Sequence, residues 1–253
     1  MKKQKDRQPI KNIDEYEQYV NLSNLISGGN QKSHTKLRKI IDQIETDRFC
    51  NSDFTYPSLL ITGKAGKNTT AKAFAKTLCF DEIREIPALH IDSFYGILHT
   101  FSNDSMSVAY IIQNIDDLRT GIILPLQQIL KGGSFSQYNY ISDDVDYYSV
   151  EGMIVITANE IDKVTKTIVD EVDHIVRLEL YTPQQLELIV LQRLRFAHIE
   201  IESDQILKSI VQFGQSDPQR IIRFLRDCYV SMRSEGRVKL LMEDVRTAMR
   251  MKN

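Results

Sequence analysis

The sequence predicts an α/β protein in which a parallel β-sheet is flanked by helices and followed by a small all-α unit. Up to about residue 180, short β-type runs alternate with helix-like stretches, an order typical of a parallel sheet. After Tyr181-Thr182-Pro183 the β-type runs stop and four helical stretches follow. We therefore expect a flexible arm over residues 1–13, an α/β core over residues 14–181 and a helical unit over residues 182–253.

The expected strands are short apolar runs, namely Ser58–Thr62, Ala88–Ile91, Val108–Ile112, Met153–Thr157 and Ile175–Leu180. Leu37, Ile40, Ile41 and Ile44 recur at helical spacing and predict an amphipathic helix. A further core helix is expected over Pro125–Leu130, before Gly132-Gly133. In the last part of the chain we expect helices over Gln184–Phe196, Asp204–Phe213, Pro218–Arg233 and Met242–Met251. Thr182 precedes Pro183 as the predicted N-cap of the first of them.

Composition and charge exclude several classes of protein. The 253 residues include 32 Lys and Arg against 34 Asp and Glu, a net charge of -2, so the whole chain lacks the basic footprint of a nucleic-acid binder. The longest unbroken apolar run, Val108–Ile112, is far shorter than the roughly 20 residues that span a membrane. Cys50, Cys79 and Cys228 are odd in number and far apart, as is typical of thiols in a reducing compartment. We expect a cytoplasmic protein without a membrane segment.

A glycine-containing turn between an expected strand and an expected helix has the context of a phosphate-binding loop. It reads Gly63-Lys64-Ala65-Gly66-Lys67-Asn68-Thr69-Thr70, against the motif G-x-x-x-x-G-K-[ST]. In that motif backbone N–H groups surround the phosphates, the lysine neutralises them and the hydroxyl holds magnesium. The first glycine and the final hydroxyl are kept, so Thr70 is the expected metal ligand.

Two motif positions of this turn have changed. Asn68 replaces the second glycine, and because asparagine tolerates positive φ we expect the loop shape to survive. Thr69 replaces the lysine, so the charge at the apex is lost. Lys64 and Lys67 remain as alternative cations for a phosphate, while solvated lysines and an accidental glycine pattern remain as the other interpretations.

The run from Val108 to Leu118 is similar to a Walker B strand, whose form is h-h-h-D-E-x-D-x-L. In this register Gln113 stands for the aspartate that organises magnesium, and Asn114 for the glutamate that activates water. An amide cannot act as a base at neutral pH, and it balances the charge of Mg²⁺ poorly. The other register makes Asp116-Asp117 the acidic pair, although aspartates are also common in turns after strands.

These motifs together resemble the AAA+ ATPases, and within them the RuvB-type Holliday-junction branch-migration motor. The residues that carry the resemblance are the phosphate loop, the Walker B-like strand, Gly152–Asn159, Ile13–Tyr16, Ile175–Leu186 and Ser216–Leu225. The resemblance implies a P-loop AAA+ core with a helical lid, Asn159 as sensor 1, and Ile13–Tyr16 beside an adenine pocket. It implies ATP or ADP as a weakly held ligand and leaves magnesium open.

The sequence departs from the family at its charged catalytic positions. Ile168–Val172 stands where the family has an L-R-D-R-F arginine finger, and only the aspartate is kept. Gln219 replaces the sensor 2 arginine, with Arg220 and Arg223 as displaced alternatives. We also expect no winged-helix DNA module after the lid. Because proteins catalyse phosphoryl transfer mainly by positioning and charge stabilisation, the resemblance implies that hydrolysis is weak or lost.

The first functional hypothesis is therefore a RuvB-like scaffold or regulatory subunit of DNA recombination or replication, catalytically weak or inert. It would join an AAA+ homologue or its own copies and contact DNA indirectly. The clamp-loader delta-prime subunit is a second, similar case, although its Ser-Arg-Cys finger does not occur here. The alternative is a divergent ATPase motor that uses Lys64 or Lys67 with Asp116 and Asp117.

A third hypothesis is a DNA-binding module. Residues 134–150, predicted as a long loop or hairpin, hold Tyr138, Tyr140, Tyr147 and Tyr148, which suit base stacking, but three aspartates there repel phosphate. The resemblance implies a partner-binding hairpin in this place. The lid arginines Arg193, Arg195, Arg220, Arg223 and Arg226 form a basic set that is more typical of a solvated helix face.

Overall fold

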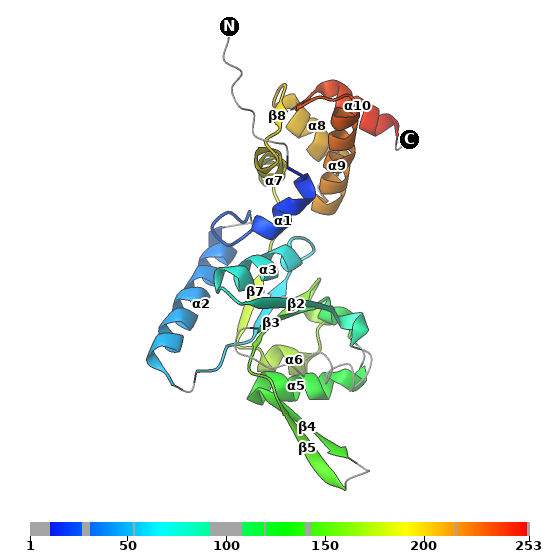
Figure 1. Ribbon diagram of the computed structural model, residues 1–253. Coiled ribbons are helices and arrows are strands. Elements are labelled where there is room, and N and C mark those ends of the chain that lie inside the picture. Colours follow the sequence, from blue (N-terminus) through cyan, green and yellow to red (C-terminus); the bar gives the residue numbers. More distant parts are fainter. Residues whose placement is uncertain are drawn as a thin grey trace. The chain divides into compact units, whose positions relative to one another are not determined.

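A computed structural model describes residues 11–26, 31–52, 54–91, 108–118, 120–139, 143–215 and 217–251. The chain forms two compact units (Figure 1). The sheet unit runs from Asn21 to Leu180, and the helical unit combines the N-terminal segment up to Val20 with the chain from Tyr181 onward.

The sheet unit is built on five parallel strands in the order β2-β3-β6-β1-β7. These strands are β1 (Leu59–Thr62), β2 (Glu82–Pro87), β3 (Val108–Gln113), β6 (Met153–Ala158) and β7 (His174–Arg177). In the register of the central strands, Leu60 of β1 and Ile112 of β3 both lie opposite Ile156 of β6. The predicted α/β fold class with a parallel sheet is confirmed.

Helices cover both faces of this sheet (Figure 1), because successive strand residues point to opposite sides. Leu59 and Ile61 pack with α2 (Gln31–Cys50) and α3 (Lys67–Thr77). Leu60 packs on the other side with α5 (Ile123–Gly132) and α6 (Lys166–Glu171). These three strand residues are fully buried, and each such side chain contributes about 1.5–3 kcal/mol of transfer free energy.

Two expected strands differ from the structure. Ala88–Ile91 is wrong as a strand, since Ala88–His90 is the short 3₁₀ helix η2 and the strand β2 precedes it. β2 was missed because it is a half-exposed edge strand of sequence E-I-R-E-I-P. Its two isoleucines, Ile83 and Ile86, are three positions apart, so the sequence shows neither an apolar run nor a regular apolar alternation. β7 ends at Arg177, earlier than expected.

The tyrosine-rich segment forms a two-stranded antiparallel hairpin of β4 (Ser134–Asn139) and β5 (Asp144–Ser149). It follows α5, whose C-cap Gly133 has φ +61°. The hairpin alternative for residues 134–150 is thus confirmed. The tyrosine side chains on which the stacking prediction depends lie outside the described part of the structure. The remaining short helices of the sheet unit are η3 (Ile115–Asp117), η4 (Thr120–Ile122) and η5 (Ile161–Lys163).

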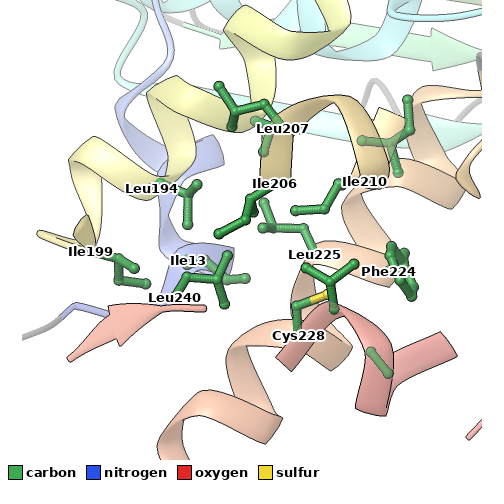
Figure 2. Close-up of a cluster of buried hydrophobic side chains, with 14 of the residues drawn as sticks. Ile13, Leu194, Ile199, Ile206, Leu207, Ile210, Phe224, Leu225, Cys228 and Leu240 are labelled. Carbon is green, nitrogen blue, oxygen red and sulfur yellow. The ribbon is translucent and has the colours of Figure 1, made fainter. Parts of the chain in front are cut away.

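The helical unit contains the four predicted helices, each with one boundary shifted by one residue. They are α7 (Pro183–Phe196), α8 (Gln205–Phe213), α9 (Pro218–Ser234) and α10 (Met242–Arg250), with the short paired strands β8 (Glu200–Ile201) and β9 (Lys239–Leu240). Thr182 caps α7 in a capping box with Gln185, as its place before Pro183 predicted. Buried side chains from all four helices form one apolar core (Figure 2).

The N-terminal strap, defined as residues 11–20, packs onto this helical core. It contains η1 (Ile13–Glu15) and α1 (Tyr16–Tyr19). Ile13 is 1% exposed and belongs to the core of the helical unit (Figure 2), although the sequence assigned it to a flexible arm. Residues 14–20, which the sequence assigned to the α/β core, also group with the helical unit. These residues join the helical unit because Ile13 is buried in its core and because Asp14 and Glu17 form ion pairs with its arginines. One apolar side chain in a short charged segment gives no periodic pattern, so the sequence did not predict this. Residues 1–10 lie outside the described part of the structure.

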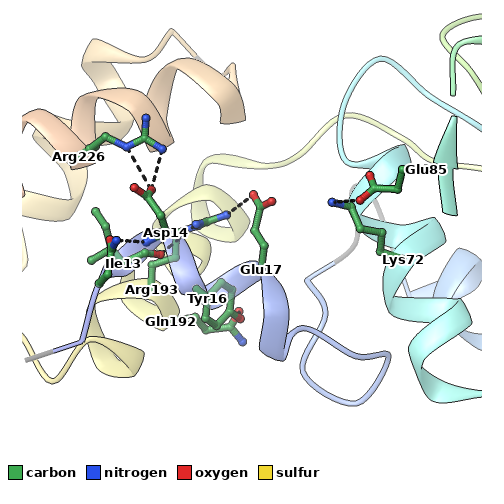
Figure 3. A network of polar contacts seen from close by, with 10 residues as sticks. Ile13, Asp14, Tyr16, Glu17, Lys72, Glu85, Gln192, Arg193 and Arg226 are labelled. Atoms are coloured by element: carbon green, nitrogen blue, oxygen red, sulfur yellow. Dashed lines mark hydrogen bonds and ion pairs between the residues drawn. The ribbon is translucent and has the colours of Figure 1, made fainter. Parts of the chain in front are cut away.

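Polar contacts fasten the strap to α7 and α9 (Figure 3). The carboxylate of Asp14 accepts hydrogen bonds from Arg226 Nε and Nη2 at 3.1 and 2.8 Å. Glu17 pairs with Arg193 at 2.9 Å, and Tyr16 donates its hydroxyl hydrogen to Gln192 at 2.8 Å. Burial raises the pKa of Tyr16, and the neighbouring guanidinium of Arg193 partly offsets that rise.

Candidate functional site

The candidate site lies at the carboxyl edge of the five-stranded sheet. In a parallel sheet all strands end at the same edge, so the segments after β1, β3 and β6 are brought together there. The strand β1 lies between β6 and β7, which places the turn after β1 where the strand order changes direction. Ligands of open α/β sheets bind at such a point.

The turn from β1 to α3 is tightly fixed to the neighbouring strands. The N–H of Gly63 donates to the carbonyl of Ala158 at 3.1 Å. A Cβ on Gly63 would lie 2.9 Å from Cβ of Leu178 and 3.0 Å from its carbonyl oxygen, so only glycine fits. Gly66 has φ +79° and is the N-cap of α3. The free N–H groups of the first turn of α3 therefore begin directly at this turn.

Asn68 and Thr69 lie inside the first turn of α3, both half-buried. The expectation that Asn68 preserves the loop through positive φ is wrong, since Asn68 is helical and Gly66 supplies the positive φ. The side-chain oxygen of Asn68 instead accepts a hydrogen bond from the hydroxyl of Thr157 at 2.8 Å. Thr69 brings no charge to the position of the motif's lysine.

Thr70 has a buried hydroxyl that lacks a partner. Its N–H donates to the carbonyl of Gly66 at 2.8 Å, which closes the first helical turn. Its side chain is fully buried, and Oγ1 has no hydrogen-bond partner among the described residues. An unsatisfied buried hydroxyl costs about 1–3 kcal/mol, so this oxygen fits a ligand such as a hydrated magnesium ion.

Lys67 supplies a buried cation two positions before Thr69, which occupies the place of the motif's lysine. It is only 9% exposed, and its ammonium donates to Oδ1 of Asn159 at 2.7 Å. Burial lowers the pKa of Lys67, while the carboxylates of Asp116 and Asp117 act in the opposite direction. Lys64, the other lysine of the turn, is exposed, and Ala65 between them is half-buried.

Asn159 joins this cation to a carboxylate. It follows β6, and its side-chain amide donates to Asp116 Oδ2 at 2.8 Å while its N–H donates to Oδ1 at 3.2 Å. Lys67, Asn159 and Asp116 thus form a continuous polar chain across the ends of β1, β3 and β6. Asp116, one of the acidic pair in the other Walker B register, therefore belongs to this hydrogen-bonded group. Asp117, the other member of that pair, is exposed.

Gln113 and Asn114 end β3 as neutral groups with protein partners. Gln113 donates its amide hydrogen to Glu85 of β2 at 2.6 Å, and Glu85 also pairs with Lys72 of α3 at 3.0 Å (Figure 3). Asn114 has φ 57° and ψ 58°, a left-handed conformation that asparagine tolerates. Its N–H donates to the hydroxyl of Thr157 at 3.2 Å.

The sequence reasoning missed three residues that hold the site together. Glu85 and Lys72 belong to no motif, and they meet only because β2 and α3 are neighbours in the fold. Thr157 links Asn68 to Asn114 by donating to one and accepting from the other. As the one polar residue in the buried run Met153–Ala158, it carried a signal that sequence reasoning could have used.

The arginine set of the helical unit is not one solvated face. Arg193 is 4% exposed and Arg226 pairs with Asp14, so two of its members hold the strap. Arg220 and Arg223 are exposed on α9, whose N-terminus is capped by the carboxylate of Asp217. In the sheet unit, the finger-like segment 168–172 lies largely within α6 and contains no basic residue.

Two kinds of feature are absent from the described residues. No group of three or more His, Cys, Asp or Glu side chains in the described ranges is arranged to hold a metal ion. Within the same ranges, no helix has the length and apolar character needed to cross a membrane.

The chain is similar in structure to RuvB from Thermotoga maritima. The RuvB Holliday junction branch migration motor superposes with a TM-score of 0.70 at 15% identity, over 91% of this chain and 73% of that chain. Two single-site variants of the same RuvB give TM-scores of 0.75 and 0.73 at 15% identity, over 93% and 91% of this chain and 73% and 72% of theirs. No protein-family model and no curated protein matches the sequence. The likeness shows that the chain has the fold of RuvB.

Proposed function

We propose that this protein is a RuvB-like AAA+ subunit that binds ATP or ADP weakly, hydrolyses ATP poorly or not at all, and acts as a cytoplasmic scaffold or regulator in DNA recombination or replication. The observation that carries the proposal is the neutral end of β3. In the register that the resemblance to a Walker B strand implies, Gln113 and Asn114 take the places of two carboxylates. The amide nitrogen of Gln113 already donates a hydrogen bond to Glu85.

The chemistry of phosphoryl transfer explains why this change matters. The reaction depends on positioned charges that neutralise the phosphates and organise the attacking water. Neither amide takes up a proton at neutral pH. An arginine finger alone contributes roughly 10³–10⁵ in rate, and segment 168–172 offers none.

Nucleotide binding is supported by what the turn retains. Gly63 and Gly66 present the N-terminus of α3, whose dipole favours phosphate. Thr70 Oγ1 would hold Mg²⁺, and a bound Mg²⁺ would supply positive charge that neutralises the phosphates. Asp116, half-buried beside Asn159, is the carboxylate left to balance its charge.

The proposed partners are an AAA+ homologue or further copies of this chain, with DNA contacted through the assembly. The fold of a branch migration motor supports this class of partner. A net charge of -2, the burial of Arg193 and the pairing of Arg226 with Asp14 argue against strong direct DNA binding.

Steady-state phosphate release with ATP and Mg²⁺, with and without DNA, tests the proposal. We expect no turnover above a protein-free background. Robust turnover that Asp116→Asn abolishes would overturn it and support the second candidate, an active motor. The polar chain from Lys67 through Asn159 to Asp116 is the observation that favours that candidate.

Recovery of the tagged chain from its native cells tests the partner. Co-purification with an active AAA+ homologue supports the scaffold. Recovery as a ring of this chain alone on DNA supports the motor.

A further inference from the structure

We infer that Lys67 is the cation that binds the polyphosphate of a nucleotide in this protein, and that it does so by exchanging its hydrogen bond to Asn159 for one to phosphate. The inference rests on the proposed nucleotide binding. It assigns to Lys67 the role that the loop motif gives to the position of Thr69.

Burial and the helix dipole both disfavour a cation at the location of Lys67, although the carboxylates of Asp116 and Asp117 act in the opposite direction. Its side chain is 9% exposed and lies in the first turn of α3, where the helix dipole is positive. A buried ammonium at the positive end of a helix is disfavoured by both desolvation and the dipole. A phosphate at the same place would offset both effects.

A second buried group points to the same ligand. Thr70 lies three residues after Lys67, so the two side chains are neighbours on one helix face. Thr70 Oγ1 is fully buried and has no partner among the described residues. A buried ammonium and an orphaned hydroxyl on one turn, together with its free N–H groups, suit a phosphate and its counter-ion.

The present partners of Lys67 form an arrangement that a ligand can replace. An ammonium has three N–H donors, and Asn159 Oδ1 takes one of them at 2.7 Å. Asp116 fixes the amide of Asn159 by accepting from its nitrogen, which turns the amide oxygen toward Lys67. Asn159 is neutral, so exchange for a multiply charged phosphate is favoured electrostatically.

The other basic residues around the turn are less suited to this role. Lys64 is exposed and would have to be ordered on binding. Lys72 is held by Glu85 in an ion pair at 3.0 Å. Lys67 is therefore the buried cation of the described site.

The test measures equilibrium binding of ATP, tripolyphosphate and adenosine by calorimetry. Lys67→Ala is expected to weaken ATP and tripolyphosphate by about tenfold or more, as for loss of a charge-assisted contact, and to leave adenosine unchanged. The matched control Lys64→Ala is expected to stay within about twofold of the unchanged protein. Lys67→Ala combined with Thr69→Lys, which moves the charge to the motif's own position, is expected to recover binding. Thermal unfolding checks that each variant folds, and Lys67→Met serves if Lys67→Ala does not.

The outcomes separate this inference from the proposed function. If Lys67→Ala binds ATP as tightly as the wild-type protein, or if only Lys64→Ala loses ATP affinity, the inference is overturned and the proposed scaffold role is unaffected. Failure of the wild-type protein to bind ATP or tripolyphosphate overturns the inference together with the proposed nucleotide binding, and leaves only the proposed scaffold role. Turnover of ATP together with lost binding in Lys67→Ala overturns the inert subunit and supports the inference.

Discussion

Replacing Arg193 by methionine tests how the N-terminal strap is held. The substitution keeps most of the apolar stem and removes the guanidinium. The ion pair to Glu17 spans 2.9 Å, but Glu17 is 46% exposed, so solvent screening limits its contribution to about 1 kcal/mol. The hydrogen bond to the carbonyl of Ile13 is long, at 3.4 Å, and contributes about 1 kcal/mol. The guanidinium also lies 5.2 Å from the ring centroid of Tyr16, worth about 0.5–1 kcal/mol.

One effect acts in the opposite direction. Arg193 Nε is buried and has no partner among the described residues, and its removal returns about 1 kcal/mol. The net expected loss for Arg193→Met is therefore about 1–2 kcal/mol. Because the positive charge near Tyr16 is also lost, the pKa of Tyr16 is expected to rise further.

Urea unfolding of the helical unit, together with hydrogen exchange of the strap peptide, measures this effect. Glu17→Gln is the matched control, and the double variant gives the coupling between the two side chains, expected near 0.5–1 kcal/mol. A loss below about 0.5 kcal/mol, with strap exchange unchanged, would refute the assignment of these contacts as what holds the strap.

Three further predictions concern the sheet unit. Gly152→Ala would bring a Cβ to 2.5 Å from the carbonyl oxygen of Val108, so we expect about 1–3 kcal/mol of destabilisation in urea unfolding; an unchanged midpoint would contradict the packing. Gln113→Asp would place a second carboxylate against Glu85 and lower the free energy of unfolding by about 1 kcal/mol, measured by urea unfolding at neutral pH. Adding Glu85→Gln is expected to restore that stability. An unchanged stability of the single variant would show that the two side chains are not in contact. Burial holds the pKa of Lys67 below its ordinary 10.5, and a bound phosphate is expected to raise it. At a pH between the pKa of Lys67 in the free protein and its pKa in the complex, ATP binding therefore takes up a proton and weakens as pH rises. Calorimetry in buffers of different ionisation enthalpy detects that proton, and equal heats in all buffers at such a pH would contradict the assignment.

The order of elements was predictable from sequence because buried strands and amphipathic helices repeat with their own periods. The runs that became β1, β3 and β6 are mostly apolar, since both faces of a parallel sheet are covered. The edge strand β2 was not predictable in the same way, because Glu82–Pro87 is half-exposed and mixes charged with apolar residues. Ile13 was missed because one buried side chain makes no period.

The candidate site was predictable where it follows a contiguous motif. Gly63 and Thr70 sit at fixed spacing, and the turn between β1 and α3 has the expected place in the fold. The bond from Lys67 to Asn159 joins residues 92 positions apart, and no spacing rule reports it. Contacts between side chains on different strands depend on the strand order, which the sequence alone did not supply.

A single-turnover experiment with radiolabelled ATP tests the central claim most directly, since it follows binding and bond cleavage on the same molecules. Protein in excess over ATP, with Mg²⁺ present, would be sampled over hours, and the protein-bound nucleotide would be separated and identified. We predict that the bound fraction is recovered as intact ATP throughout. Conversion of that bound ATP to ADP within minutes would show that the site still carries the charges needed for cleavage and would contradict the account.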